Sequence, residues 1–533
     1  MHRRDFLRLA SSAAAALWLP TFVRAEVSSP RYFPINPFAW SEATIDDLQA
    51  AIFRGSQSAA SLVKSYLRRI HEIDRDGPAI NSVIELNPDA LKIARALDRE
   101  RKAHGPRSPL HGIPVLIKDN IDTHDRMMTT AGSLALLGSI APRDSFVAKK
   151  LRDAGAVILG KTNLSEWANF RAHRSSSGWS GGGGQTKNPY ALDRQPSGSS
   201  SGSAAAVAAS LCAVAVGTET DGSIISPSSF CGIVGIKPTI GLVSRFGIIP
   251  ISQTQDTAGP MARTIRDAAI LLGALAGEDP NDPATEHSRD KSSVDYTTFL
   301  DSGGLRGARL GILHKYSRND GSGAIIRSAV KIMKNAGAEI IELPNDLSLE
   351  KSGDAEYQVL LYEFKDGLNK YFSSLGPTAP VRSLADLIDF NERHKEKEMP
   401  FFGQQILIEA QNKGPLTEQA YLDALEKCRR SRAEGIDAVM DEHKLDALVA
   451  HAGGPAPKID WLLGDRDGGG CTTPAAVAGY PSITLPAGDV HGMPVGICFF
   501  GRAFSEGPLL KIAYAFEQLT KARKPPGFLP AIG

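Results

Sequence analysis

Short apolar runs alternate with helical patterns along most of this chain. Four of these runs lie in its first half, at residues 113–117, 157–159, 213–216 and 233–236. Apolar runs of this length, bounded by turn residues, are typical of strands buried on both faces, because such strands need no polar side. Their alternation with helices predicts an α/β fold in which helical layers enclose a sheet.

The expected helices and the later strands follow the same scheme. A helical pattern covers residues 44–73, where Thr44 and Asp47 have the spacing of a capping box. Pro88 stands at the first turn of the next helix. The second half of the chain has predicted strands at 309–313, 339–343, 447–450 and 482–485, and predicted helices at 324–334 and 508–520.

Domain organisation follows from what interrupts this pattern. No linker rich in Gly, Pro or Ser divides residues 26–533, so we expect a single domain with a helical elaboration around residues 345–435. The net charge of +1 gives no field that attracts nucleic acid or an anionic membrane. Five scattered cysteines without a CxxC pair predict neither a disulfide framework nor a zinc ribbon.

The first 25 residues have the features of an export signal. Arg3 and Arg4 precede an apolar stretch at 9–23, and a small-residue cleavage pattern ends at Ala25. The apolar stretch is shorter than the roughly 20 residues that span a bilayer. We therefore predict a twin-arginine-type signal, cleaved after Ala25 or retained as an anchor, and an exported protein that is periplasmic or secreted.

Two motifs have the letters of known sites without their structural context. Residues 155–162 fit the P-loop pattern GxxxxGK[ST], but the four variable residues are apolar and predict a buried strand, not a phosphate-binding loop. Residues 198–202 fit the GxSxG nucleophile elbow, but the polar, proline-containing segment before them predicts no strand. An α/β-hydrolase is kept as an alternative. No HExxH occurs, and no metal site is predicted.

Three segments carry residues suited to nucleophilic attack on an amide or ester. Lys118 ends the apolar run at 113–117, where burial would lower the pKa of its amine and make it a usable base. Residues 196–203 form a Ser/Gly run that leads into a small-residue helix at 204–209. Ser223 follows Gly222 in a turn whose backbone N–H groups could converge as an oxyanion hole. Each segment alone also fits a solvent-directed lysine, a loop or an ordinary turn.

Taken together, the three segments resemble the amidase signature family. The resemblance covers roughly residues 41–520 and includes the segments 131–133, 160–163, 232–239, 256–263 and 479–482. It implies a large mixed, twisted β-sheet covered by helices on both faces. It also implies a Ser–Ser–Lys triad in which Ser223 is the nucleophile, Ser199 is the bridging serine 24 positions earlier and Lys118 is the base.

The same resemblance implies roles for neighbouring residues. The peptide bond between Gly198 and Ser199 is expected to be cis, and Ser200 is expected to orient the triad by hydrogen bonding. The backbone N–H groups of Thr220, Asp221, Gly222 and Ser223 are expected to form the oxyanion hole. No metal or organic cofactor is required.

Within the family, the match is closest to the peptide-amidase branch, which shares Asp221 where the commoner motif has glycine. The expected substrate is the C-terminal amide of a peptide or amino acid, hydrolysed to the free acid and ammonia. A generic aliphatic or aryl amidase, a non-catalytic amide-binding protein and the glutaminase component of a tRNA-dependent amidotransferase are the alternatives. The sequence predicts no nucleic-acid partner and no membrane insertion of the mature protein, and it leaves the oligomeric state open.

Overall fold

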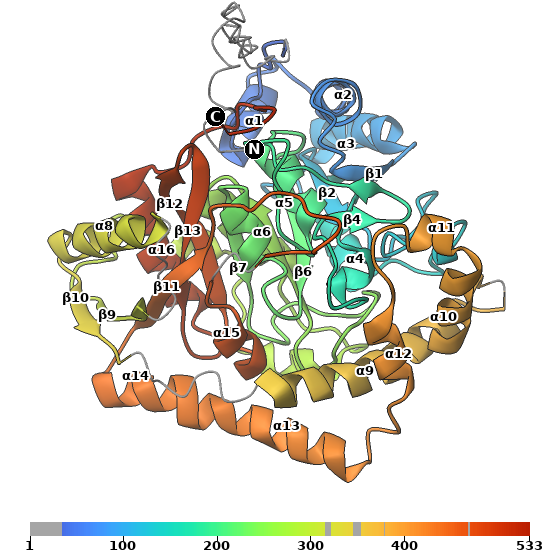
Figure 1. Ribbon diagram of the computed structural model, residues 1–533. Coiled ribbons are helices and arrows are strands. Elements are labelled where there is room, and N and C mark those ends of the chain that lie inside the picture. Colours follow the sequence, from blue (N-terminus) through green and yellow to red (C-terminus); the bar gives the residue numbers. More distant parts are fainter. Residues whose placement is uncertain (1–34, 315–320, 345–352, 378, 467–469, 533) are drawn as a thin grey trace, which may run out of the picture. The chain divides into compact units, whose positions relative to one another are not determined.

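A sheet of eleven strands forms the core of the described structure (Figure 1). The computed structural model describes residues 35–314, 321–344, 353–377, 379–466 and 470–532. The strand order is β1-β3-β2-β6-β8-β7-β12-β13-β11-β9-β10. The strands are β1 (Val83–Leu86), β2 (Pro114–Lys118), β3 (Val157–Thr162), β6 (Val214–Glu219), β7 (Val234–Lys237), β8 (Thr257–Ala262), β9 (Arg309–Ile312), β10 (Glu339–Glu342), β11 (Ala447–Gly453), β12 (Ser482–Val490) and β13 (Met493–Phe500).

Strand directions make the sheet mixed. Neighbours β3, β2 and β6 run parallel, as do β11, β9 and β10, whereas the strands between these two groups pair antiparallel. A separate hairpin of β4 (Trp179–Ser180) and β5 (Gly184–Gln185) contains the glycine run at 181–184. The predicted α/β class with a large mixed sheet is confirmed.

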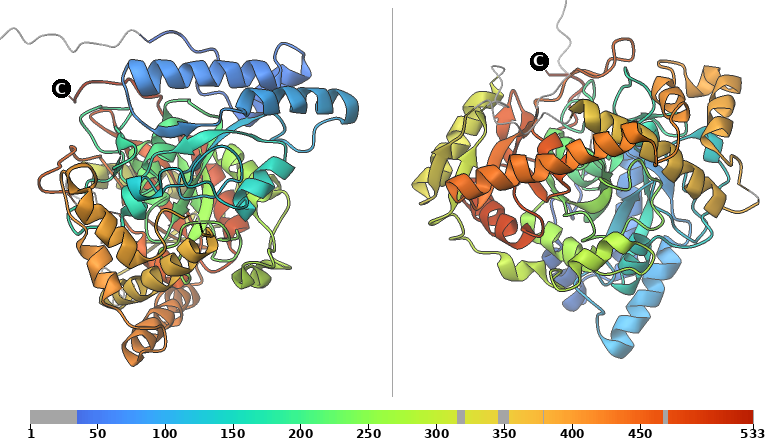
Figure 2. Two further views of the ribbon diagram at one scale, coloured as in Figure 1. Left: turned by 90° about the vertical axis from the view of Figure 1, so that its right-hand side faces the viewer. Right: turned by 90° about the horizontal axis from the view of Figure 1, so that it is seen from below.

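Helices cover both faces of the sheet (Figures 1 and 2). Helices α5 and α6 pack against the central strands and against each other, while α7 and α16 form a second packed pair. The helices are α1 (Ile45–Phe53), α2 (Ala59–Ile70), α3 (Ala90–His104), α4 (Phe146–Asp153), α5 (Ser201–Ala208), α6 (Ile225–Phe230), α7 (Ile265–Leu275), α8 (Ser322–Asn335), α9 (Gly353–Ser374), α10 (Leu384–Arg393), α11 (Lys395–Glu398), α12 (Gln405–Gln411), α13 (Gln419–Ser431), α14 (Ala438–His443), α15 (Thr473–Ala478) and α16 (Glu506–Thr520).

The helical pattern at 44–73 forms two helices, not one. The capping box of Thr44 and Asp47 starts α1 as expected, but a second capping box starts α2 at Ser58. Gly55, with φ of +71°, turns the chain between them. Apolar periodicity alone cannot locate such a break, because the apolar side chains of both helices face the same core.

Strands β8 and β13 were not expected from the sequence. Both contain glycine and proline, which weaken strand propensity, yet each lies in the sheet interior between two partners. Pairing with neighbours on both sides thus overrides a weak local signal. The region around 345–435, predicted to be a helical elaboration, contains α9 to α13, of which α9, α12 and α13 pack together.

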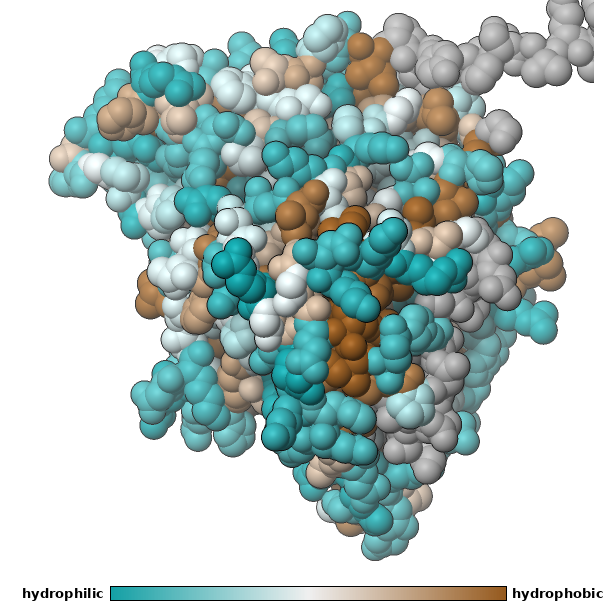
Figure 3. Space-filling view, turned by 90° about the vertical axis from the view of Figure 1, so that its left-hand side faces the viewer, coloured by the Kyte–Doolittle hydropathy of each residue, from teal (hydrophilic) through white to brown (hydrophobic). Residues whose placement is uncertain are grey.

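Hydrophilic side chains dominate the face in Figure 3, where apolar side chains are confined to patches between polar ones. None of the helices in the described ranges is both long and apolar enough to cross a bilayer.

Candidate active site

The carboxyl ends of three parallel strands bring the predicted chemical groups together. Strand β2 pairs with β3 at Lys118 and Thr162, and with β6 at Ile117 and Val216. Lys118 at the end of β2 is therefore adjacent to the last residues of β6. The carboxyl ends of parallel strands are where α/β proteins place ligands.

Lys118 is completely buried at this strand end. Its Nζ lies 2.7 Å from Ser199 Oγ, 2.9 Å from Thr218 Oγ1 and 3.3 Å from the Thr218 carbonyl oxygen. Burial lowers the pKa of the amine to about 7, against the opposing effect of the Asp256 and Glu219 carboxylates. Lys118 makes no ion pair with any described residue, so its charged form lacks a bonded counter-ion.

Hydrogen bonds from Ser200 and Asn120 hold Thr218, which is a partner of the Lys118 amine. Ser200 Oγ donates to the Thr218 carbonyl at 2.9 Å and accepts from the Thr218 N–H at 3.1 Å. Asn120 Nδ2 donates to Thr218 Oγ1 at 3.0 Å. The Ser200 side chain therefore connects the Ser199 loop to the end of β6 by two hydrogen bonds.

The Ser199 loop precedes α5, and Ser199 itself is fully buried. The Gly198–Ser199 peptide bond is cis, as the resemblance implies. The Ser199 carbonyl oxygen accepts from Ser165 N–H at 3.1 Å. A Cβ added at Gly198 would lie 2.2 Å from Ser165 Oγ and 3.2 Å from Ser177 Oγ, so only glycine fits there without a shift of these neighbours.

Ser223 lies in the turn between β6 and α6. Its carbonyl oxygen accepts from Ser200 N–H at 3.1 Å, which brings this turn alongside the Ser199 loop. Its hydroxyl makes no hydrogen bond to a described residue, and the structure shows no direct bond between the hydroxyls of Ser199 and Ser223. Ser223 is 8% exposed, whereas Ser199 is completely buried, so of the two serines Ser223 is the one that solvent reaches.

The turn offers unused backbone donors. The N–H groups of residues 220–223 have no hydrogen-bond acceptor among the described residues. The Glu219 side chain stabilises the end of the turn that leads into α6. Its Oε2 accepts from Ile224 N–H at 2.7 Å and from Ile225 N–H at 2.9 Å. Free N–H groups on a turn fixed in this way are suited to stabilise a developing negative charge.

The carboxyl of Asp221 is buried and hydrogen-bonded within the protein. Its Oδ2 accepts from Thr473 Oγ1 at 2.6 Å, and burial raises the pKa of this carboxyl, against the opposing effect of the Thr472 and Thr473 hydroxyls. Asp221 thereby connects the turn to α15.

The structure brings Lys118, Ser199, Ser200 and the turn at 220–223 together at the carboxyl ends of β2 and β6. No role was expected from the sequence for Thr218, Glu219 or Ser165, although all three lie in or beside the motifs described above. Their roles depend on which side chains face one another across the sheet, and a linear pattern does not contain that information.

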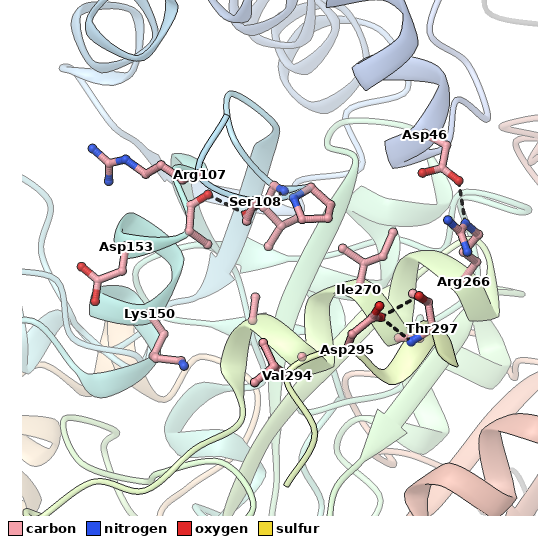
Figure 4. A pocket seen from close by; sticks show the side chains of 16 residues that line it. Asp46, Arg107, Ser108, Lys150, Asp153, Arg266, Ile270, Val294, Asp295 and Thr297 are labelled. Atoms are coloured by element: carbon pink, nitrogen blue, oxygen red, sulfur yellow. Dashed lines mark hydrogen bonds and ion pairs between the residues drawn. The ribbon is translucent and has the colours of Figure 1, made fainter. Parts of the chain in front are cut away.

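A hollow of about 590 Å³ lies at the opposite end of the same strands (Figure 4). Residues 107–110, which lead into β2, line it together with side chains of α4 and α7. It contains none of the predicted triad residues. Among the residues the structure describes, no group of three or more His, Cys, Asp or Glu side chains is arranged to hold a metal ion.

Sequence comparisons agree on one family. The family model described as "Amidase" matches residues 61–510. A probable amidase of Arabidopsis thaliana is 44% identical over 93% of this chain and 93% of its own length. A putative amidase of Schizosaccharomyces pombe is 38% identical, covering 95% and 91%. A glutamyl-tRNA(Gln) amidotransferase component of Thermoanaerobacter pseudethanolicus is 34% identical, covering 91% and 97%.

Among solved structures, two that resemble this chain closely are of peptide amidase. Native peptide amidase from Stenotrophomonas maltophilia superposes with a TM-score of 0.88 at 51% identity, covering 92% of this chain and 99% of that one. A complex of the peptide amidase PAM with the competitive inhibitor chymostatin gives the same TM-score at 52% identity, covering 92% and 100%.

The comparisons overturn the prediction of export. The relatives described above simply as amidases come from a plant and a fungus and align over nearly the whole chain, whereas twin-arginine signals are used in bacterial export. The prediction of a twin-arginine signal and of a periplasmic or secreted protein is therefore wrong. An arginine pair before a short apolar stretch is a brief pattern, and it carries less information than an alignment over the whole fold. Residues 1–25 lie outside the described residues.

Proposed function

This chain belongs to the amidase family, and from that premise we propose that it is a serine amidase that hydrolyses the C-terminal amide of peptides or amino-acid amides. In this proposal Ser223 is the nucleophile, Ser199 the bridging group and Lys118 the base. The observation that carries it is the 2.7 Å contact between a buried, ion-pair-free Lys118 amine and Ser199 Oγ. A single domain over residues 26–533 is part of the same proposal.

The contacts of Lys118 favour its neutral form as the acceptor. A neutral amine has two N–H donors and one lone pair. Thr218 offers two acceptors to Nζ, its carbonyl oxygen and its Oγ1. When both N–H groups donate to Thr218, the lone pair is left for the hydroxyl proton of Ser199. The pKa of about 7 keeps a large part of the amine neutral at physiological pH.

The reaction then proceeds through an acyl-enzyme. Ser199 gives its proton to Lys118 and takes the proton of Ser223 as Ser223 Oγ attacks the amide carbon. The free N–H groups of residues 220–223 stabilise the oxyanion. The proton returns through Ser199 to the leaving nitrogen, which departs as ammonia. Water adds to the acyl-enzyme by the reverse sequence, releasing the carboxylic acid and restoring Ser223.

The gap between Ser199 and Ser223 does not argue against this path. Catalytic hydrogen bonds are often long without substrate and tighten in the complex. The Ser200 N–H bond to the Ser223 carbonyl already holds the two segments together at 3.1 Å.

The peptide part of the proposal is supported by similarity. Peptide amidase from Stenotrophomonas maltophilia shares half of its sequence with this chain over nearly the whole fold. The relatives named only as amidases, and the amidotransferase component, keep a generic amidase and a glutaminase as the alternatives to test.

The decisive experiment measures ammonia release. The purified protein is incubated with an amidated dipeptide, an aryl amide, glutamine and a free dipeptide, with Ser223→Ala as the control. We expect ammonia from the dipeptide amide and none from the free dipeptide. Release from the aryl amide or glutamine alone would contradict the peptide assignment. No release above the Ser223→Ala variant from any substrate would indicate a non-catalytic amide-binding protein.

A further inference from the structure

Three segments distant in the sequence meet in an exposed apolar cluster. They are the β4–β5 hairpin with its glycine run, residues 401–402 after α11, and the loop at 458–465. Phe401 and Trp461 stack with ring centroids 4.6 Å apart and planes inclined by 16°. Trp179 packs edge-on against Phe401 and Phe402, at 5.9 and 5.1 Å. We call Phe401, Trp461, Leu462 and Leu463 the apolar rim.

The apolar rim is exposed to an unusual degree for its chemistry. Phe401 is 40% exposed, Trp461 43%, Leu462 88% and Leu463 59%. Adjacent exposed apolar side chains on a soluble protein indicate a binding surface, whereas scattered ones need no explanation.

The backbone beneath the rim is fixed. Asp460 Oδ1 accepts from the N–H groups of Leu462 and Leu463, at 3.1 and 2.9 Å. Trp461 Nε1 donates to Gln185 Oε1 at 3.0 Å. The buried Arg171 guanidinium lies over the Trp179 ring at 5.4 Å. A surface held in this way loses little conformational freedom on binding, which favours affinity for an apolar ligand.

A series of hydrogen bonds connects the apolar rim to the Ser199 loop. Gln185 Nε2 donates to the Ser177 carbonyl at 2.8 Å, and Gly178 N–H donates to Ser165 Oγ at 2.9 Å. Ser165 N–H in turn donates to the Ser199 carbonyl at 3.1 Å.

The other rim segment reaches the same loop from a second side. The Pro457 carbonyl accepts from Gln195 N–H at 3.1 Å, shortly before Ser197, and the Asp465 carboxylate accepts from Ser177 N–H at 3.0 Å. The hairpin and the 458–465 loop therefore both border the segment that carries Ser199.

We propose that the apolar rim binds the peptide chain that precedes the amidated residue, and that it selects apolar side chains there. This inference rests on the proposed function and specifies its substrate class. An extended peptide advances about 3.3–3.6 Å per residue, so a chain anchored by its amide at Ser223 leads away from the site over neighbouring surface. Apolar and aromatic substrate side chains lose water on contact with Trp461 and Leu462, whereas polar side chains gain nothing there.

The test compares three amides that share a C-terminal alanine. They are alanine amide, acetyl-Phe-Leu-alanine amide and acetyl-Ser-Ser-alanine amide. For Trp461→Ala and Leu462→Ala we expect KM for the apolar peptide amide to rise about tenfold, the change for roughly one buried apolar contact. The other two substrates should change less than twofold. Trp461→Phe, which keeps a stacking ring, should retain most of the preference. Phe53→Ala removes an aromatic side chain that is 90% exposed on α1 and should change nothing.

Each other outcome overturns the inference. An equal loss on all three substrates would mean that Trp461 serves only the fold. A wild-type enzyme that hydrolyses both peptide amides equally well, with variants unchanged, would refute the rim while leaving the peptide-amidase proposal intact. Hydrolysis of aryl amides but of no peptide amide would refute the proposed function instead. Vesicle binding or dimerisation that Trp461→Ala abolishes, with KM unchanged, would assign the rim to a membrane or to a second copy.

Discussion

The two ends of the parallel strands β2, β3 and β6 offer contrasting environments. At the amino end, the hollow of Figure 4 is lined by charged groups of which several are paired, as in the 2.6 Å contact between Arg266 and Asp46. At the carboxyl end, Lys118 is buried, and its bonded partners are neutral oxygens. A lysine whose protonated form is disfavoured by burial and whose amine contacts a serine hydroxyl is suited to general-base catalysis, so the carboxyl end, and not the hollow, carries the candidate site.

Replacing a serine at each end of the strands is expected to give the largest difference in turnover. Ser223→Ala removes the proposed nucleophile and should lower turnover about 10⁵-fold or more. Ser108→Ala makes the same change in the hollow and should leave turnover within twofold. Ammonia release measures both, and thermal unfolding checks that each variant is folded. Activity of Ser223→Ala within a hundredfold of wild type would break the comparison.

Lysine gives the next largest contrast. Lys118→Ala should cost about 10³- to 10⁴-fold in kcat, because the proposed general base is lost. Lys150→Ala is the matched change in the hollow, where burial also lowers the lysine pKa but the nearby Asp153 carboxylate opposes the shift. Its kcat should stay within twofold. Equal effects of the two substitutions would show that Lys118 only supports the fold.

The pH profile sharpens the same contrast without a mutation. Below the Lys118 pKa of about 7 the amine holds a proton and cannot accept one from Ser199. The rate constant kcat/KM should therefore approach a tenfold fall per pH unit on the acid side, and decrease about fiftyfold between pH 7 and pH 5. A profile that stays flat down to pH 5 would contradict a lysine base.

The smallest expected effect concerns the groups that hold the amine. Thr218→Val keeps the shape of the side chain but removes the Oγ1 partner of Lys118 and Asn120. A lost buried hydrogen bond costs about 1–3 kcal/mol, so kcat should fall about tenfold. Thr297→Val, at the edge of the hollow, removes an exposed bond to Asp295 and serves as the control. An unchanged kcat in Thr218→Val would remove Thr218 from the proposed mechanism.

Much of the architecture could be predicted because its signals are local. The buried strands β2, β3, β6 and β7 coincide with apolar runs, and Thr44 marks the start of α1. Most of the apparent P-loop at 155–162 forms the buried strand β3, as its apolar residues predict. Strand β8 was not predicted because Gly259 and Pro260 weaken its own signal, and its place in the sheet depends on pairing with β6 and β7.

The sequence by itself determined the kinds of groups available at the site: a lysine at a strand end, a serine–glycine loop and a turn with a serine. These follow from residue types and short-range patterns. Only the tertiary structure decided that the Lys118 amine meets Thr218, a hundred positions away in the chain, and that Trp461 stacks on Phe401. The physical reason is that strand register and loop packing fix which distant side chains touch, and burial at that contact then sets the pKa of Lys118.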